Sequence, residues 1–217
     1  MEAFLPEDIH FATTDEMVAK YPNASAKERE NILCKEYGAV FLIGIGGWKA
    51  DGELRHDGRA PDYDDWTTER PDGGKGINGD LLVWNPLLQM SFELSSMGIR
   101  VNKEVLLEQL DMCGCPERRD YVWHQMLLDG TLPQTIGGGV GQSRLCQFIL
   151  QCAHIGEVQH AWYNPVEVEI LKNHDIKLLG LGEFNEDPMA ASLHPFVDSN
   201  KHGVRTGSPE QLSVSTD

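Results

Sequence analysis

The sequence has no apolar run long enough to cross a bilayer. Its longest run, from Ala39 to Gly46, falls far short of the roughly 20 residues that a spanning helix needs. The first residues, Met1 to Phe4, carry neither the basic region nor the apolar region of a secretory signal. From the sequence alone we therefore expect a cytoplasmic protein that makes no contact with a membrane.

Positive charge is scarce. The chain has 18 Lys and Arg against 34 Asp and Glu, which gives a formal net charge of −16. Binding to nucleic acid requires a basic surface, so we expect no nucleic-acid partner. A small anionic ligand is not excluded, because a few well-placed arginines decide its binding locally.

Cysteines are few, and their spacing does not suit a zinc site. Cys113 and Cys115 are separated by one residue, and no second pair completes a tetrahedral set. We therefore expect reduced, partly buried thiols rather than a metal or redox centre. The five cysteines are Cys34, Cys113, Cys115, Cys146 and Cys152.

Two capping boxes predict helices near the N-terminus. Thr13 with Glu16 opens the first, and Ser25 with Glu28 opens the second. The apolar run 39–43 then predicts a strand that is buried on both faces.

The remaining pattern predicts an α+β fold, an antiparallel sheet flanked by helices. We expect first a long loop over 44–79, functional or disordered, and a hairpin over 80–96. Helices follow over 103–112 and 118–129, then a Gly-rich strand or turn over 135–140 and a helix over 142–152. A short strand over 157–162 and a last helix and strand over 165–179 complete the pattern. Residues 1–180 form the predicted domain, and 181–217 read as a polar, disordered tail.

The hairpin brings two carboxylates together. If residues 85–88 form the turn, Trp84 faces Gln89 and Asp80 faces Glu93. The predicted core face carries Leu81, Val83, Met90, Phe92 and Leu94, and the other face carries Asp80, Glu93 and Ser95. Opposed carboxylates repel unless a cation relieves them, and hard oxygen ligands of this kind suit Mg²⁺ bound with substrate phosphates. The alternative is a polar face on which each carboxylate is simply solvated.

Two further elements carry chemistry. Strict alternation along the second hairpin strand would place Arg100 on the core face, and a bulge or a strand end at Gly98 would re-aim it. A salt-bridged surface arginine is the alternative. The segment 137–145 has glycines that let the backbone approach a ligand, with Arg144 at the start of a helix, but it matches neither a Walker loop nor a dinucleotide fingerprint.

Together, Asp80, the pattern Glu-x-x-Ser-x-x-x-Arg over 93–100 and Gly-x-Gly-x-x-Arg over 139–144 resemble the core of class II aminoacyl-tRNA synthetases. The subgroup that handles aspartate and asparagine is the most similar. The resemblance implies that Asp80 and Glu93 bind Mg²⁺ and ATP. It also implies that Arg100 holds the side-chain carboxylate of aspartate, and that Gly139 and Arg144 bind nucleotide.

Longer phrases resemble the bacterial-type aspartate–ammonia ligases over about Phe4 to Leu179. The phrases are residues 38–47, 59–66, 78–80, 92–100 and 133–139. This resemblance implies an enzyme that makes asparagine from aspartate, ATP and ammonia through aspartyl-adenylate, releasing AMP and pyrophosphate. It further implies that Asp64 and Ser96 lie at the bound amino acid and that Leu94 and Ser95 lie along the adenylate. We add Arg59 as a phosphate contact. The alternative for Asp62, Asp64 and Asp65 is a solvated acidic loop. The mechanism needs no Ser, Cys or His nucleophile, so we expect His56 and His124 to be structural.

The chain departs from that family at its N-terminus, where family members are longer. The segments absent here carry the homodimer motif and the arginine that grips the α-phosphate. The sequence is then either a fragment of a longer ligase or a shortened protein, and for a shortened protein we expect crippled or absent adenylation. The alternative hypothesis is a truncated, non-catalytic paralogue that binds nucleotide or aspartate.

Overall fold

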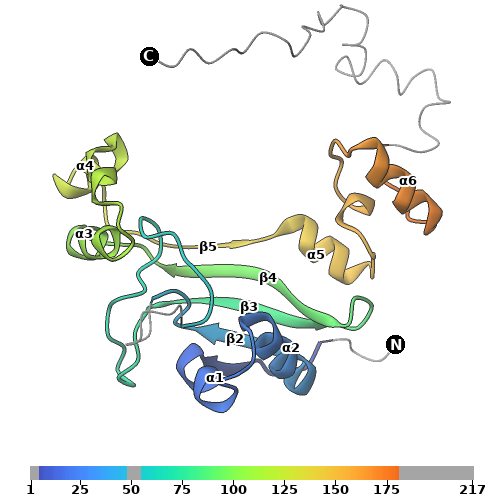
Figure 1. Cartoon of the computed structure of the whole chain (residues 1–217), viewed down its shortest axis with the longest axis horizontal. Coiled ribbons are helices and arrows are strands. Elements are labelled where there is room, and N and C mark those ends of the chain that lie inside the picture. The colour runs from blue at the N-terminus through green and yellow to red at the C-terminus, as the bar shows by residue number, and fades with distance from the viewer. Residues whose placement is uncertain (1–4, 48–54, 181–217) are drawn as a thin grey trace, which may run out of the picture. The chain divides into compact units, whose positions relative to one another are not determined.

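A five-stranded mixed sheet, in the order β1-β2-β3-β4-β5, is the framework of the first part of the chain (Figure 1). Its strands are β1 His10–Thr13, β2 Ala39–Ile43, β3 Asn78–Asn85, β4 Met90–Ile99 and β5 Ile136–Val140. The predicted α+β class is confirmed. The sheet is not wholly antiparallel, because β1, which the sequence analysis did not predict, pairs parallel with β2.

The computed structural model describes residues 5–47 and 55–180. The chain divides into two compact units, residues 1–155 and 156–217. The polar tail expected over 181–217, and part of the loop expected over 44–79, lie outside the described residues. No helix among the described residues is long and apolar enough to cross a membrane.

Both N-terminal helices begin at the predicted capping boxes. Helix α1, Thr14–Lys20, follows Thr13, and α2, Ala26–Tyr37, follows Ser25. Gly38 ends α2 with a φ of 77°, a conformation that glycine adopts without strain. The two helices cover one face of the sheet. The core between the helices and this face contains Met17, Leu33, Cys34, Val40, Leu42 and Leu82.

The helices after β4 partly match the prediction. Helix α3, Lys103–Met112, has the predicted bounds. The helix expected over 118–129 is instead a 3₁₀ turn, η1 Pro116–Asp120, and a short α4, Val122–Leu128, because Tyr121 between them is extended. Helix α5, Gln142–Ile149, packs through Phe148 on the sheet face opposite α2.

The second unit contributes little regular structure among its described residues, 156–180. The 3₁₀ turn η2, Ile155–Glu157, spans the boundary, and α6, Pro165–Asn173, begins at the capping residue Asn164. The strands expected over 157–162 and after α6 are not formed in this range, so those two predictions were wrong.

The hairpin of β3 and β4 differs from its predicted register. Asn85 pairs with Met90, so the turn consists of residues 86–89 instead of the predicted 85–88. The register therefore differs from the predicted one from the first pair onward. Further along, Leu82 pairs with Glu93 while Leu81 pairs with Ser95, which leaves Leu94 as the extra residue of a β-bulge. The side chain of Arg100 is therefore re-aimed by a bulge at Leu94, and not by the bulge or strand end expected at Gly98.

This bulge decides which side chains share a face. Asp80 faces Ser96 rather than Glu93, so the predicted direct opposition was wrong. Glu93 pairs with Leu82, and because Leu82 and Asp80 are two residues apart on one strand, both carboxylates still lie on the same face. Ser95 pairs with Leu81 and lies on the opposite face, contrary to prediction.

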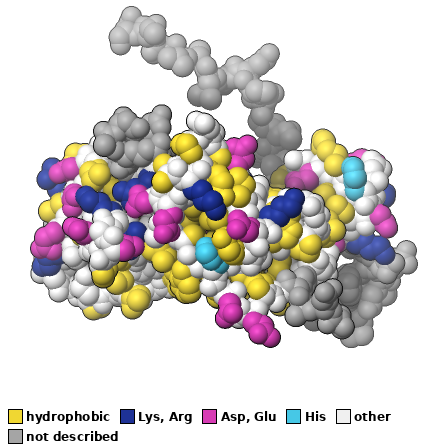
Figure 2. Space-filling view, turned by 90° about the horizontal axis from the view of Figure 1, so that it is seen from below, with side chains coloured by type: hydrophobic (Ala, Val, Ile, Leu, Met, Phe, Trp, Pro, Cys, Tyr) yellow, Lys and Arg dark blue, Asp and Glu magenta, His cyan; other side chains and the backbone are white. Residues whose placement is uncertain are grey.

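The sheet face opposite α1 and α2 is only partly covered. Phe41 and Ile43 of β2 are half-buried, so the expected burial on both faces holds for only part of that strand. Large apolar side chains are exposed on the strands of this face: Phe11, Met97, Ile99, Ile136 and Val140. Figure 2 shows hydrophobic side chains reaching the surface between charged groups of both signs.

Candidate functional site

A cavity of about 420 Å³ lies between α2, the loop after β2 and the sheet. It brings together three predicted site residues, Arg59, Asp80 and Glu93. Its full lining is Ser25, Ala26, Lys27, Glu30, Ile45, His56, Asp57, Gly58, Arg59, Asp80, Leu82 and Glu93. The predicted carboxylate pair therefore faces one shared space, although its members are offset along the strands.

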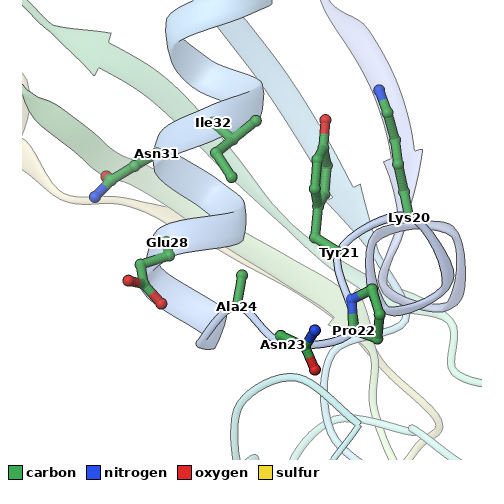
Figure 3. Close-up of a pocket in the computed structure, with 8 residues that line it drawn as sticks. All are labelled: Lys20, Tyr21, Pro22, Asn23, Ala24, Glu28, Asn31 and Ile32. Atoms are coloured by element: carbon green, nitrogen blue, oxygen red, sulfur yellow. The ribbon is translucent and has the colours of Figure 1, made fainter.

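A second hollow, of about 700 Å³, lies where α2 meets the segment between α1 and α2 (Figure 3). Its lining, from Lys20 to Ala24 together with Glu28, Asn31 and Ile32, includes no predicted site residue. The carboxylate of Glu28 is already bonded to Ser25 in the capping box, and the Asn31 side chain accepts from the Ser91 amide. We therefore assign the site to the smaller cavity.

Asp80 is buried and forms an ion pair with Arg59. Burial raises the pKa of Asp80 above its usual value; Arg59 and a hydrogen bond with Ser96 oppose this rise, and Glu93 adds to it. Arg59 retains donor capacity, because its buried Nε has no hydrogen-bond partner among the described residues.

Glu93 has an arginine of its own. Arg144, in the first turn of α5, places Nη1 3.3 Å from a carboxylate oxygen of Glu93 and 3.2 Å from its backbone oxygen. Both side chains are about half exposed, with values of 50% and 40%. Thus each predicted carboxylate ligand lies beside one predicted phosphate-binding arginine.

The wall formed by α2 contains an ionic network that the sequence analysis missed. Glu30 lies 3.1 Å from Lys27 Nζ and 3.1 Å from His56 Nε2, and it also accepts from the Ser91 hydroxyl. Burial raises the pKa of Glu30, but the hydrogen bond with His56 and the charge of Lys27 outweigh it, so the net pKa lies below the usual value. In the sequence, Lys27 and Glu30 resemble an ordinary surface pair, which gave no signal.

Arg100 occupies a separate, polar corner of the same sheet face. It forms an ion pair with Asp64, which is only 1% exposed. The Tyr63 hydroxyl accepts from Arg100 Nη2 at 2.9 Å, and the guanidinium lies 3.9 Å from the centre of the Tyr63 ring. Asp64 thus contacts Arg100 directly, and Tyr63 is a site residue that the sequence analysis did not single out.

Glycines keep this face open. Gly98 and Gly137 are paired across β4 and β5. A side-chain carbon at Gly98 would lie 2.8 Å from Asp64, and one at Gly137 would lie 2.7 Å from Arg100. Gly139 pairs with Ser96, and a carbon added there meets no atom within 4 Å. Asp80, Ser96 and Gly139 therefore form one row across β3, β4 and β5, with free space above Gly139.

The other two predicted residues point elsewhere. Leu94 packs in the core with Val83 and Phe148, so only its backbone can contribute to the site. Ser95 is 5% exposed on the face away from Asp80. Their predicted contact with an adenylate remains a prediction, and it is confined to main-chain atoms for Leu94.

Asp80 and Glu93 could hold a divalent cation only with help from a ligand. The described residues contain no group of three or more His, Cys, Asp or Glu arranged for a metal. Two carboxylates completed by substrate phosphates and water is a coordination that suits Mg²⁺. The donor set therefore fits Mg²⁺ in the presence of a nucleotide, and it does not fit a self-sufficient metal centre.

Comparisons with known proteins agree with the sequence motifs. The family model of aspartate-ammonia ligase (AsnA) matches residues 1–175. The aspartate–ammonia ligase of Parabacteroides distasonis is 59% identical over 155 residues, which are 71% of this chain and 45% of that protein. The chain thus spans about half the length of this curated relative.

The fold has a counterpart among solved structures. The aspartyl-tRNA synthetase of Entamoeba histolytica superposes with a TM-score of 0.52 at 16% identity, covering 76% of this chain and 34% of that one. At this identity the likeness concerns the fold alone, and it confirms the expected class II synthetase architecture. The family match, by contrast, extends over most of the sequence: the chain belongs to the aspartate–ammonia ligase family.

Proposed function

We propose that the chain is an aspartate–ammonia ligase, which joins aspartate to AMP and then passes the aspartyl group to ammonia. The observation that carries the proposal is the arrangement of Asp80 and Glu93 on one cavity, each beside an arginine. Phosphoryl chemistry needs this combination, because the negative charge of ATP and of the attacking carboxylate must be offset by fixed cations.

The charge balance of the cavity favours a nucleotide that arrives with a divalent cation. Its lining holds four carboxylates, Glu30, Asp57, Asp80 and Glu93, against two permanent cations, Lys27 and Arg59. A bare triphosphate would be repelled by this excess of negative charge. Mg²⁺ held by Asp80 and Glu93 would supply the missing positive charge at the phosphates.

The two arginines would change partners when the nucleotide binds. Arg59 and Arg144 now neutralise Asp80 and Glu93. With the carboxylates serving a metal ion, both guanidinium groups are released to bond phosphate oxygens, for which their planar donor geometry is well suited. The ion pairs of the ligand-free chain thus keep the arginines close to their binding positions.

Arg100 would bind the amino acid. Asparagine carries its amide on the side chain, so the side-chain carboxylate of aspartate must attack the α-phosphorus and displace pyrophosphate. Arg100, which the family resemblance assigns to that carboxylate, is then left to hold the α-carboxylate, which does not react. Because Asp64 and Tyr63 fix the guanidinium, it is oriented before aspartate arrives. Uncharged ammonia finally attacks the activated carbonyl, and AMP departs.

The test is to incubate the purified 217-residue chain with aspartate, ATP, Mg²⁺ and ammonium and to quantify asparagine and AMP. We expect equimolar formation of both. Glu93→Gln should lower the rate at least about a hundredfold, because it removes charge stabilisation at the phosphates. Glu108→Gln, on the exposed side of α3, should not change it. A chain that binds ATP and aspartate but never forms AMP would reject catalysis and favour the non-catalytic paralogue.

A further inference from the structure

Gln109 of α3 is a polar side chain completely enclosed in the protein, with an exposed fraction of 0%. It lies on the helix face that also presents Leu106 and Leu110 to the core. An amide buried at such a position costs free energy unless its donors and acceptor are bonded. Its bonding therefore shows what the fold uses it for.

All of the bonds of this amide go to one short loop. Gln109 Nε2 donates to the backbone oxygens of Pro61 at 2.8 Å and Asp64 at 3.1 Å. Gln109 Oε1 accepts from the backbone N–H of Trp66 at 2.8 Å. Both amide hydrogens and the carbonyl are thus used, and the loop 61–66 is held at three points by one side chain.

The loop 61–66 carries the two side chains that fix Arg100. Asp64 pairs with the guanidinium, and Tyr63 contacts it through both hydroxyl and ring. Two backbone hydrogen bonds join the loop to the chain around Arg100: Asp65 N to Ile99 O and Val101 N to Tyr63 O, both 3.0 Å. A displacement of the loop would therefore turn the guanidinium.

A second anchor supports the same loop from outside. Asp62 lies 3.2 Å from Nε2 of His124 in α4 and 3.7 Å from Nη1 of Arg118 in η1. These contacts are partly exposed to water, so they hold the loop less firmly than the enclosed amide does. Gln109 is therefore the enclosed side-chain anchor of the loop, beside the backbone hydrogen bonds that join it to the chain just before β3 and to the chain around Arg100.

We propose that Gln109 is a positioning residue, which sets the affinity for aspartate by holding the loop 61–66 against Arg100. The part concerning aspartate rests on the proposed function; the mechanical part does not. Gln109 touches no reacting atom in this scheme, and the lining of the cavity around Asp80 contains no residue of 61–66.

Hydrogen exchange tests the mechanical part on the chain itself. Gln109→Leu and Gln109→Met remove the amide and keep an apolar side chain of similar size. The matched control is Gln147→Leu in α5, another buried glutamine, whose amide bonds Cys152 O at 3.4 Å. We expect the amides of Asp65, Trp66 and Val101 to exchange about tenfold faster or more in both Gln109 variants, and at the wild-type rate in the control.

Kinetics test the functional part. The KM for aspartate should rise about tenfold or more in Gln109→Met, because small misplacements of a binding group weaken orientation, while the KM for ATP stays within about twofold. Unchanged exchange at the three amides, or equal rises in both KM values, would overturn the inference. If the wild-type chain forms no AMP, the ligase proposal fails, and the exchange result still decides whether Gln109 holds the loop.

Discussion

Asp80 and Glu93 are each paired with one arginine, and the two pairs differ in environment. Asp80 and Arg59 are largely buried, whereas Glu93 and Arg144 are about half exposed. Removing one member of a buried pair leaves a charge without compensation, which is costly, whereas exposed pairs contribute little. We therefore expect the Asp80 pair to matter for the fold as well as for binding, and the Glu93 pair mainly for binding.

Gly139 offers a way to test ligand space without disturbing the protein. Gly139→Ala places a methyl group where no protein atom lies within 4 Å, so its melting temperature should stay close to that of the wild type. Affinity for ATP should fall about tenfold or more, because the methyl group occupies the space assigned to nucleotide.

The neighbouring position supplies the contrast. In Gly138→Ala the new carbon would lie 2.7 Å from Cβ of Met97, so this variant should lose about 1–3 kcal/mol of unfolding free energy. Denaturant unfolding and ATP titration of both variants give the comparison. Normal ATP affinity in Gly139→Ala would show that nucleotide does not lie over this strand.

The cysteines should differ sharply in reactivity. Burial raises the pKa of the Cys34 thiol to about 12, and the nearby charge of Glu30 adds to the rise. Cys146 is exposed. Because the thiolate is the reactive form, a thiol reagent such as a disulfide dye should label Cys146 rapidly and Cys34 only after unfolding. Peptide mapping of the labelled sites checks this, and labelling of native Cys34 would contradict the packing of α2.

At the scale of elements, α2 connects stability to the site. Its residue Glu30 joins Lys27, His56 and Ser91, which come from three different segments. A helix whose ionic network forms the cavity wall cannot shift without moving that wall. The stability of α2 and the shape of the cavity should therefore change together.

Glu30→Gln should reveal this through pH. The folded pKa of Glu30 lies below its usual value of 4.5, so the ionised group stabilises the fold above about pH 4.5 and this contribution is lost as pH falls through the lower folded value. At about pH 7 the variant should lose about 1 kcal/mol of unfolding free energy. Urea unfolding should show the stabilities of the two proteins converging as the pH falls below about 4.5; a constant difference would exclude the ionic contribution.

The sequence predicted the positions of helices and strands far better than the register in which the strands pair. The capping residues Thr13 and Ser25 located α1 and α2 because their hydrogen bonds are local. β1 has only four residues and depends on a distant partner, β2, so no local pattern announced it. Tyr121 likewise divides a helix at a residue of no special propensity.

The candidate site was predicted by residue type and missed in part by geometry. Alternation alone places Arg100 on the core face, and the bulge at Leu94 reverses the faces of every residue after it. A bulge arises from pairing across strands, which a single strand does not encode. Gln109 did leave a signal, since it is a polar residue on the apolar stripe with Leu106 and Leu110.

At the scale of the whole molecule, nucleotide and metal should stabilise the chain together. ATP with Mg²⁺ at about a hundredfold excess over Kd should add about 2.7 kcal/mol of stability, which corresponds to a rise of about 5–10 °C in melting temperature. With EDTA the rise should be much smaller, because the carboxylates of the cavity then repel the phosphates. Thermal unfolding measures both, and Asp80→Asn should abolish the difference; equal shifts with and without Mg²⁺ would remove the metal from the site.

The two faces of the sheet carry different kinds of residues. The face under α1 and α2 carries the acidic cavity, the Gly139 row and Arg100, whereas the opposite face carries α5 and exposed apolar side chains. The chain spans about half of its curated relative. The family match covers residues 1–175, so the residues of both sheet faces lie within it.

The extra residue at Leu94 decides which side chains of β4 lie on which face of the sheet. Substitutions do not change this assignment, but an insertion or deletion of one residue does. Deleting one residue between Glu93 and Ser95 would exchange inside for outside at Ser96, Gly98 and Arg100 together, while leaving the composition of the strand almost intact. A single-residue deletion there would therefore move Arg100 to the sheet face opposite Asp80 and Glu93, whereas point substitutions along β4 would leave it on their face.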